Sequence, residues 1–188
     1  MKPSIRPILF SAPMVLALLE GRKTMTRRIA RIRDIDGNDC AYGKPGDLLW
    51  VRESLRRNKE PDERDDENRG IYYIRYAADN VPNGYWSPLM ILGGFNTVPR
   101  GFSVPSIHMP RAWSRLTLHI TDVRVQRLQE IGQGDACAEG CPSIHEPYTW
   151  FQSLWDEING AGAWDENPWV WALTFTVIKA NVDQVLYE

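Results

Sequence analysis

The sequence predicts a single α+β domain built on a curved antiparallel sheet or a β-barrel, with short helices beside it. Several segments have the alternating or β-branched pattern of strands, and the two or three short helical segments between them each end at a glycine. The 188 residues are 43% hydrophobic and 24% charged, which allows one sizeable core. We expect one domain over residues 1–188, with an insertion at about 55–112.

The first two elements lie near the N-terminus. The apolar run 8–10 predicts a buried strand, and residues 14–20 are strong helix formers. Ser11 is placed to cap this helix, Pro13 lies in its first turn, and Gly21 fits the position just after its end. The sequence therefore predicts both the start and the end of this helix.

The middle of the chain changes character several times. Turn residues at 42–47 precede segment 48–54, whose alternation predicts a half-buried strand. Segment 59–67 holds six acids in nine residues and predicts a solvated loop. Residues 71–76 are β-branched and aromatic, which is typical of a strand. Segment 79–109 is rich in glycine, proline, asparagine and serine, so we expect little regular structure there.

The C-terminal part has the strongest strand patterns. Residues 116–125 alternate between apolar and polar side chains and predict a strand. Short helices are predicted at about 134–139 and 148–159, and residues 169–179 have β propensity throughout. Strands mixed with a few short helices, without strict alternation, favour the α+β class.

Charge and cysteine content limit the kinds of protein that the chain can be. The 22 basic and 24 acidic residues leave a net charge of −2, which excludes a histone-like composition, although six of the basic residues lie within positions 22–33. No apolar run approaches the roughly 20 residues that span a bilayer, so we expect no membrane contact. Three cysteines are too few for a disulfide framework. We therefore expect a cytoplasmic protein.

The sequence predicts neither a metal nor another cofactor. Cys137, Cys141 and His145 are spaced by four residues, but a zinc site usually has four ligands with tighter pairs. Gly140 and Pro142 also interrupt the helix that would align these side chains. No phosphate-binding or dinucleotide-binding glycine pattern occurs.

The basic segment after the first helix holds residue types that can do chemistry. Lys23 and Thr26 lie three positions apart, so an amine and a hydroxyl can meet. Crowding by Arg22, Arg27 and Arg28 would lower the pKa of the lysine, which could then accept a proton from a hydroxyl. Arg28 can hold a carboxylate or a phosphate through two hydrogen bonds. The alternative interpretation is a solvated basic face without chemistry.

The pattern of Gly21, Lys23, Thr26 and Arg28 resembles the signature of the ASCH domain family, which often has glutamate where this chain has Thr26. The resemblance touches most of the chain outside residues 55–112. Further segments are similar to longer ASCH-related proteins of phages and prophages; they are Arg52-Glu53, residues 105–111, residues 154–160 and residues 167–171.

The resemblance implies a PUA-like β-barrel fold, related to RNA-binding modules. It also implies an activity, because one compact bacterial branch of the family removes the acetyl group from N4-acetylcytidine with a lysine, a threonine three residues later and a more distant glutamate. Lys23 and Thr26 match the first two, and a gap-free count from the shared strand at 116–125 reaches Glu139.

These three residues are our predicted catalytic set for an amidohydrolase. Thr26 would attack the amide carbonyl, Lys23 would accept its proton, and Glu139 would position Lys23 and help to protonate the leaving amine. Arg28 and backbone N–H groups would stabilise the oxyanion. A variant in which Lys23 and Glu139 activate water directly fits equally well.

Further residues are predicted to bind the substrate. We expect this role for Arg27, Arg28, Trp50, Arg52 and Glu53. Aromatic side chains can stack on a base, and the candidates are Trp50, Tyr72, Tyr73, Trp86 and Trp113. The tryptophans near the C-terminus are expected to lie mainly in the core; they are Trp150, Trp155, Trp169 and Trp171.

Two other functions stay open at this point. In a non-catalytic RNA-binding module, the basic residues would contact phosphates; these are Lys23, Arg27, Arg28, Arg31 and Arg33. A ribonuclease, an activity also found among ASCH relatives, could use Lys23 and Arg28. The predicted partner is therefore a pyrimidine nucleoside or single-stranded RNA, and the oligomeric state is not predicted.

Overall fold

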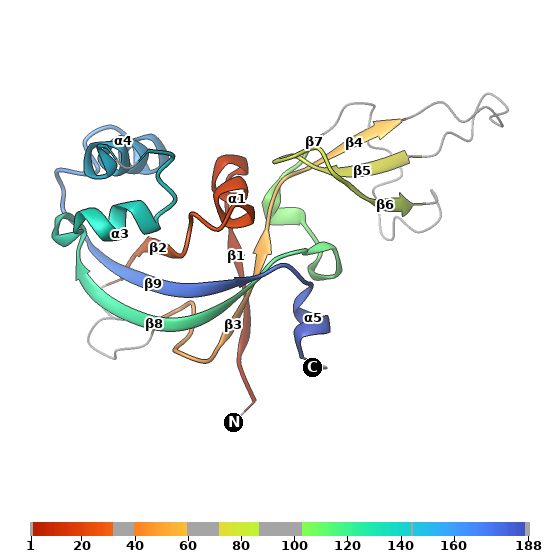
Figure 1. The fold of residues 1–188 in the computed structure, drawn as a ribbon, viewed down its shortest axis with the longest axis horizontal. Coiled ribbons are helices and arrows are strands. Elements are labelled where there is room, and N and C mark those ends of the chain that lie inside the picture. The colour runs from red at the N-terminus through yellow and green to blue at the C-terminus, as the bar shows by residue number, and fades with distance from the viewer. Residues whose placement is uncertain (1, 32–39, 60–71, 87–102, 144, 187–188) are drawn as a thin grey trace, which may run out of the picture.

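A five-stranded mixed sheet forms the centre of the protein (Figure 1). The computed structural model describes residues 2–31, 40–59, 72–86, 103–143 and 145–186. The strand order is β1-β3-β8-β9-β2. The strands are β1 (Ile5–Leu9), β2 (Met25–Ile29), β3 (Leu48–Arg52), β8 (Thr117–Arg127) and β9 (Trp169–Ile178).

The main sheet is antiparallel, as expected, except at one edge. β1 pairs in parallel with β3, whereas the pairs β3–β8, β8–β9 and β2–β9 are antiparallel. The helix and second strand that follow β1 return the chain to the sheet in the same direction, which a hairpin turn cannot do. The predicted strands at 8–10, 116–125 and 169–179 correspond to β1, β8 and β9, with shifts of a few residues at their ends.

The main sheet is curved but not closed into a barrel. In the described part of the chain, β1 and β2 are its two edges and share no backbone ladder. A register shift between Ile120 and Asp122 interrupts the long β8–β9 pair, and such irregularities increase strand bending. The Arg28 side chain of β2 bridges the two edges, since its Nη2 donates to the Leu9 carbonyl of β1 at 2.9 Å. The β-barrel alternative is therefore replaced by an open curved sheet.

A second, four-stranded sheet lies at one side of the main sheet (Figure 1). Its order is β6-β5-β4-β7, and its strands are β4 (Leu55–Lys59), β5 (Tyr72–Tyr76), β6 (Pro82–Trp86) and β7 (Ser103–Val104). These strands lie within the predicted insertion, so segment 79–109 has more regular structure than we expected. The predicted acidic loop falls mostly at residues 60–67, outside the described residues. One domain with an insertion stays a prediction.

Short helices cover the main sheet. They are α1 (Ala12–Leu19), α3 (Gln133–Ala138), α4 (Pro147–Asn159) and α5 (Val182–Val185). Helix α1 begins after Ser11, whose side chain makes no capping hydrogen bond, and its end is followed by Gly21 at φ 75°. None of the helices in the described ranges is both long enough and apolar enough to cross a membrane.

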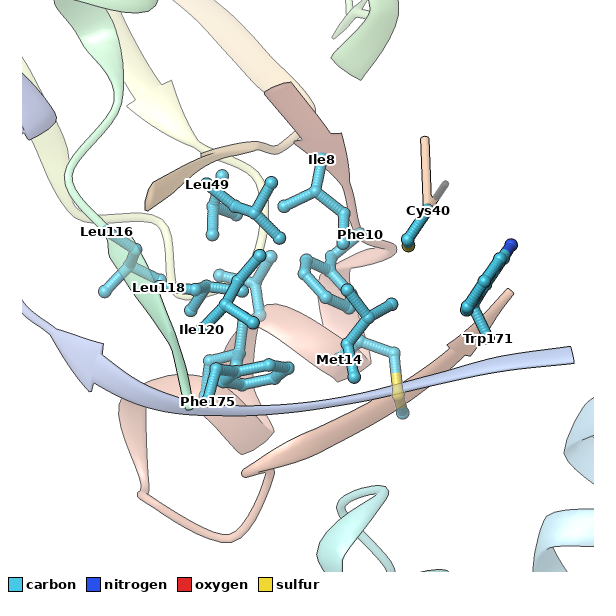
Figure 2. Packing of buried hydrophobic residues seen from close by; sticks show 14 of the residues in the cluster. Ile8, Phe10, Met14, Cys40, Leu49, Leu116, Leu118, Ile120, Trp171 and Phe175 are labelled. Carbon is cyan, nitrogen blue, oxygen red and sulfur yellow. The ribbon is translucent and has the colours of Figure 1, made fainter. Parts of the chain in front are cut away.

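Two hydrophobic clusters determine where these helices lie. The larger cluster joins α1 to the concave side of the main sheet, and Figure 2 shows Met14 of α1 near Ile120 and Phe175 of the sheet. The smaller cluster holds α3 and α4 against the ends of β8 and β9; it comprises Leu128, Ile131, Ala136, Phe151, Trp155, Trp164 and Val170. The start of β2 therefore lies between α1 on one side and α3 and α4 on the other.

Candidate functional site

A pocket of about 260 Å³ lies where α1, β2, α3 and α4 meet. Its polar lining comes mainly from Lys23, which precedes β2, from β2 itself and from the residue after α3. Its apolar lining comes from the end of β1, from α1 and from α4. The polar lining residues are Ser11, Lys23, Thr26, Arg27, Arg28, Glu139 and Asn159. The pocket thus brings together four of the five residues of the basic segment singled out from the sequence with the predicted glutamate.

The backbone holds Lys23 and Glu139 side by side although 116 positions separate them. The two residues form an isolated antiparallel bridge, and the N–H of Thr24 donates to the Ala138 carbonyl at 2.8 Å. Gly140 makes this approach possible. Its φ is 102°, and a Cβ atom there would lie 2.9 Å from the Cβ of Ala17 and 3.2 Å from that of Lys23.

Lys23 and Glu139 form a buried ion pair. The Lys23 Nζ donates to Glu139 Oε2 at 2.8 Å and to the Glu139 carbonyl at 2.7 Å. The two side chains are 2% and 3% exposed. Burial lowers the pKa of Lys23 from its ordinary value; Glu139 opposes this effect, while Arg28 and Arg27 add to it. A lysine in this state releases its proton more readily and can serve as a base.

Arg27 is a second cation on the same carboxylate. Its Nη1 donates to Glu139 Oε1 at 3.1 Å, and its Nη2 donates to Asp135 Oδ2 at 2.6 Å. Its side chain is fully buried, while that of Asp135 is 27% exposed. Sequence reasoning missed Asp135. A signal was present, because Asp135 and Glu139 are four residues apart and therefore lie on the same side of α3.

Thr26 and Arg28 complete the polar floor. Thr26 is 1% exposed, and its Oγ1 accepts a hydrogen bond from Arg28 Nη1 at 3.1 Å. The Arg28 guanidinium also lies 5.1 Å from the centre of the Phe10 ring. Among the described residues, no hydrogen bond joins Thr26 to Lys23, although both line the pocket. A cation beside the Thr26 oxygen would stabilise negative charge on that oxygen or on a reacting group next to it.

The walls and rim of the pocket are apolar. Leu9, Ile29 and Ile158 line it and are 40%, 54% and 61% exposed. Helix α4 supplies the deeper part of the wall, with Phe151, Leu154 and Trp155. Sequence reasoning assigned Trp155 to the core and did not connect α4 with the site. Nothing in the local pattern indicates which residues face a pocket and which face the core.

Three of the predicted substrate-binding residues lie elsewhere. Trp50, Arg52 and Glu53 do not line this pocket. The Arg52 guanidinium lies 5.3 Å from the Trp50 ring and donates to the Ile107 carbonyl. Glu53 is 1% exposed and forms a bidentate ion pair with Arg115, with N–O distances of 2.8 and 2.9 Å.

Glu53 belongs to a network that joins the two sheets. Arg115 also contacts Asp79, which follows β5, at 2.7 and 3.1 Å, and its guanidinium lies 3.7 Å from the Tyr76 ring. Burial raises the pKa of Glu53, and the hydrogen bonds from Arg115 oppose this effect. The partners of Glu53 are therefore those of a structural ion pair.

The cysteines do not form a cluster with other metal-binding side chains. In the ranges that the structure describes, no three side chains of histidine, cysteine, aspartate or glutamate are grouped to hold a metal ion. Cys137 and Cys141 are free thiols, and Cys141 Sγ donates to the Ser143 carbonyl at 2.7 Å.

These features define an α+β protein with a buried lysine–carboxylate pair at the floor of a small, apolar-walled pocket. No family model matches the sequence, and no curated protein does. Among solved structures, the chain is similar to the crystal structure of protein EF3133 from Enterococcus faecalis V583, described with the family model DUF984. The TM-score is 0.45 and the identity 11%, over 97% of this chain and 84% of the other.

Proposed function

We propose that the protein is an amidohydrolase of the ASCH family, with a PUA-like fold, which removes the acyl group from the exocyclic amine of a pyrimidine nucleoside. N4-acetylcytidine is the first candidate substrate. The observation that carries this proposal is the buried pair of Lys23 and Glu139, which shares a pocket with the Thr26 hydroxyl and the Arg28 guanidinium. A base, a nucleophile and a cation for an oxyanion are the groups that amide hydrolysis requires.

In the proposed reaction, neutral Lys23 accepts the Thr26 hydroxyl proton as the oxygen attacks the amide carbon. The C–N bond then breaks, Lys23 returns the proton to the leaving amine, and cytidine departs. Water hydrolyses the threonine ester and releases acetate. Glu139 accepts hydrogen bonds from Lys23 and Arg27, which supports a role in positioning Lys23.

A direct attack by water is the other route. Lys23 would then take the proton of a water molecule, and Thr26 would only help to orient the substrate. Because no hydrogen bond joins Lys23 to Thr26 in the described residues, both routes are retained. Mass spectrometry of the protein after rapid acid quenching separates them, since only the first route forms an ester on Thr26.

Two features of the pocket favour a neutral nucleoside over a polynucleotide. The cations of the basic segment already have partners: Lys23 and Arg27 have carboxylates, and Arg28 has carbonyl and hydroxyl oxygens. The rim is apolar, whereas a phosphate backbone is bound by free basic side chains. Of the other predicted phosphate contacts, Arg31 is exposed and Arg33 lies outside the described residues.

The proposal is tested by incubating the protein with N4-acetylcytidine and measuring cytidine by chromatography. We expect turnover by the wild type. Lys23→Met should lose about 100-fold or more in kcat because the base is removed, and methionine is chosen because it fills a similar volume. Thr26→Val should lose a similar factor if Thr26 is the nucleophile. Thr117→Val is the matched control, since Thr117 is also a buried strand threonine but bonds to the Ala180 carbonyl.

Two outcomes would contradict this proposal. Absence of turnover by the folded wild type would reject the activity, and full activity of Lys23→Met would reject the mechanism. Cleavage of single-stranded RNA by the same preparation would point to the ribonuclease alternative instead.

A further inference from the structure

The Glu139 carboxylate binds two cations, Lys23 and Arg27, and Arg27 is also bound by Asp135, which does not line the pocket. Lys23 donates to one carboxylate oxygen of Glu139, and Arg27 donates to the other. Asp135 accepts a hydrogen bond from the other terminal nitrogen of Arg27, Nη2, and Arg124 of β8 donates to the same oxygen of Asp135 at 3.2 Å. A chain of alternating charges therefore runs from the pocket floor to the partly exposed Arg124.

We propose that Arg27 and Asp135 are positioning residues that set the protonation and placement of Lys23 through Glu139. Arg27 holds one oxygen of the carboxylate, so that Lys23 retains only the other. Asp135 holds Arg27 in turn and offsets part of its charge. The kinetic consequence rests on the proposed function, whereas the effect on the titration of Lys23 does not.

The direction of the effect follows from the contacts. Conversion of Asp135 to a neutral side chain removes the negative charge that pairs with Arg27 and leaves the Arg27 charge to act more strongly on Glu139 and Lys23. Both changes make protonated Lys23 less favourable, so the pKa of Lys23 should fall. Loss of charge at Arg27 should have the opposite effect.

Within the residues that the structure describes, the other charged groups around Lys23 form no ion pair with Asp135, so they do not change the direction of the expected pKa shift. Arg28 adds a positive charge on β2, and Tyr42 interacts with Arg28. Arg22 donates to the Gly140 carbonyl and pairs with Glu20. Helices α1 and α4 contribute no titratable side chain to the pocket lining. Asp135 is therefore the acidic member of the charge network that is partly exposed, so its charge can be removed without substitution of the buried Lys23, Glu139 and Arg27.

The direct test is a titration of Lys23 by NMR, with ¹³Cε-labelled lysine. The chain has five lysines, so the spectrum is sparse, and the Lys23 signal is the one that disappears in Lys23→Met. We expect Asp135→Asn to lower the pKa of Lys23 by about half a unit to one unit, as expected for loss of one partly screened charge. Asp135→Glu, which keeps the charge, should leave it near the wild-type value.

Asp122→Asn is the matched control, because Asp122 pairs with Arg124 but does not contact Arg27. In the kinetic arm, Asp135→Asn should move the acidic limb of the kcat profile to lower pH by the same amount, with little change in KM. An unchanged or raised pKa of Lys23 in Asp135→Asn, or an equal shift in Asp122→Asn, would overturn the proposal. A shifted titration without turnover of N4-acetylcytidine would keep this proposal and reject the proposed function.

Discussion

Single residues at the pocket floor show how much the site depends on burial. A lysine that is 2% exposed loses most of its hydration, and its ammonium group is tolerated because the carboxylate and the carbonyl oxygen of Glu139 accept hydrogen bonds from it. Arg27 is buried in the same way and needs a second carboxylate. The floor and the adjoining Asp135 therefore combine two buried cations with two acids, and removal of any one of them takes an ion-pair contact from its neighbours.

The first prediction at this scale concerns the pH dependence of stability. The pKa of Lys23 in the folded protein is lower than its ordinary value of 10.5. At a pH between the folded pKa and 10.5, the unfolded chain therefore binds more protons than the folded protein. The free energy of unfolding should therefore rise with pH in that window, by at most about 1.4 kcal/mol per unit, and lose this contribution below the folded pKa. Urea unfolding of the wild type and of Lys23→Met, from about pH 7 to 10, measures the difference.

Lys23→Met removes the titration of Lys23, while all other titratable side chains remain in the protein. We subtract the unfolding free energy of Lys23→Met from that of the wild type. If this difference stays constant or falls as pH rises, the prediction that the pKa of Lys23 is lowered is wrong.

The second prediction at this scale concerns Gly140. Gly140→Ala should destabilise the protein by about 2 kcal/mol or more, because φ is 102° and the new Cβ would press on Ala17 and Lys23. Gly134→Ala is the control, since Gly134 lies in α3 with nothing within 4 Å of an added Cβ. Gly134→Ala should be neutral or stabilising by up to about 1 kcal/mol. Equal effects of the two substitutions in urea unfolding would contradict this explanation.

Whole elements position the site by packing on one another. Helix α1 is held by the larger core cluster, α3 and α4 by the smaller one, and β2 runs between them. The second sheet is joined to the main sheet differently, through Arg115. This residue bonds to Glu53 after β3 and to Asp79 after β5, and it stacks on Tyr76.

The prediction at this scale concerns that junction. Arg115→Leu should destabilise the protein by about 3 kcal/mol, because it leaves Glu53 buried without its cation. Arg111→Leu is the control, since Arg111 pairs with Asp183 at the surface and such pairs contribute about 1 kcal/mol or less. Urea unfolding measures both. A loss for Arg115→Leu no larger than that for Arg111→Leu would show that Arg115 does not stabilise the junction.

At the scale of the whole molecule, the small net charge hides an uneven distribution. The chain carries −2 in total, with six of its 22 basic residues at 22–33 and six of its 24 acids at 60–67. In the described part of the basic segment, Lys23, Arg27 and Arg28 face inward to carboxylates and other oxygens. These three basic residues therefore do not contribute to a basic surface, whereas Arg31 is exposed.

The corresponding prediction concerns salt. Turnover of a neutral nucleoside should change by less than about twofold in kcat/KM between about 50 and 200 mM salt, because few counterions are displaced. An RNA-binding module with several phosphate contacts should instead lose affinity by orders of magnitude over that range. Both quantities are measured on the same preparation, with N4-acetylcytidine and a labelled single-stranded RNA. Tight, steeply salt-dependent RNA binding without turnover would favour the alternative function.

Much of the element order follows from local sequence. Gly21 ends α1 because it accepts a positive φ, and the alternation in 116–125 and 169–179 predicts β8 and β9. The parallel pairing of β1 with β3 and the second sheet were not predicted, and the choice between a curved sheet and a closed barrel was left open. Strand pairing depends on contacts between distant segments, which local patterns do not specify.

The candidate site divides in the same way. Lys23, Thr26 and Arg28 stand out in the sequence because their spacing resembles a known signature, and Glu139 was reached by counting along a shared pattern. The role of Asp135, the wall formed by α4 and the separate network of Glu53 depended on the tertiary structure. The sequence by itself determined which charged groups are present and where the helices and strands that carry them begin. Only packing decided which of these charges are buried together, because burial and pairing arise when residues more than 100 positions apart come into contact.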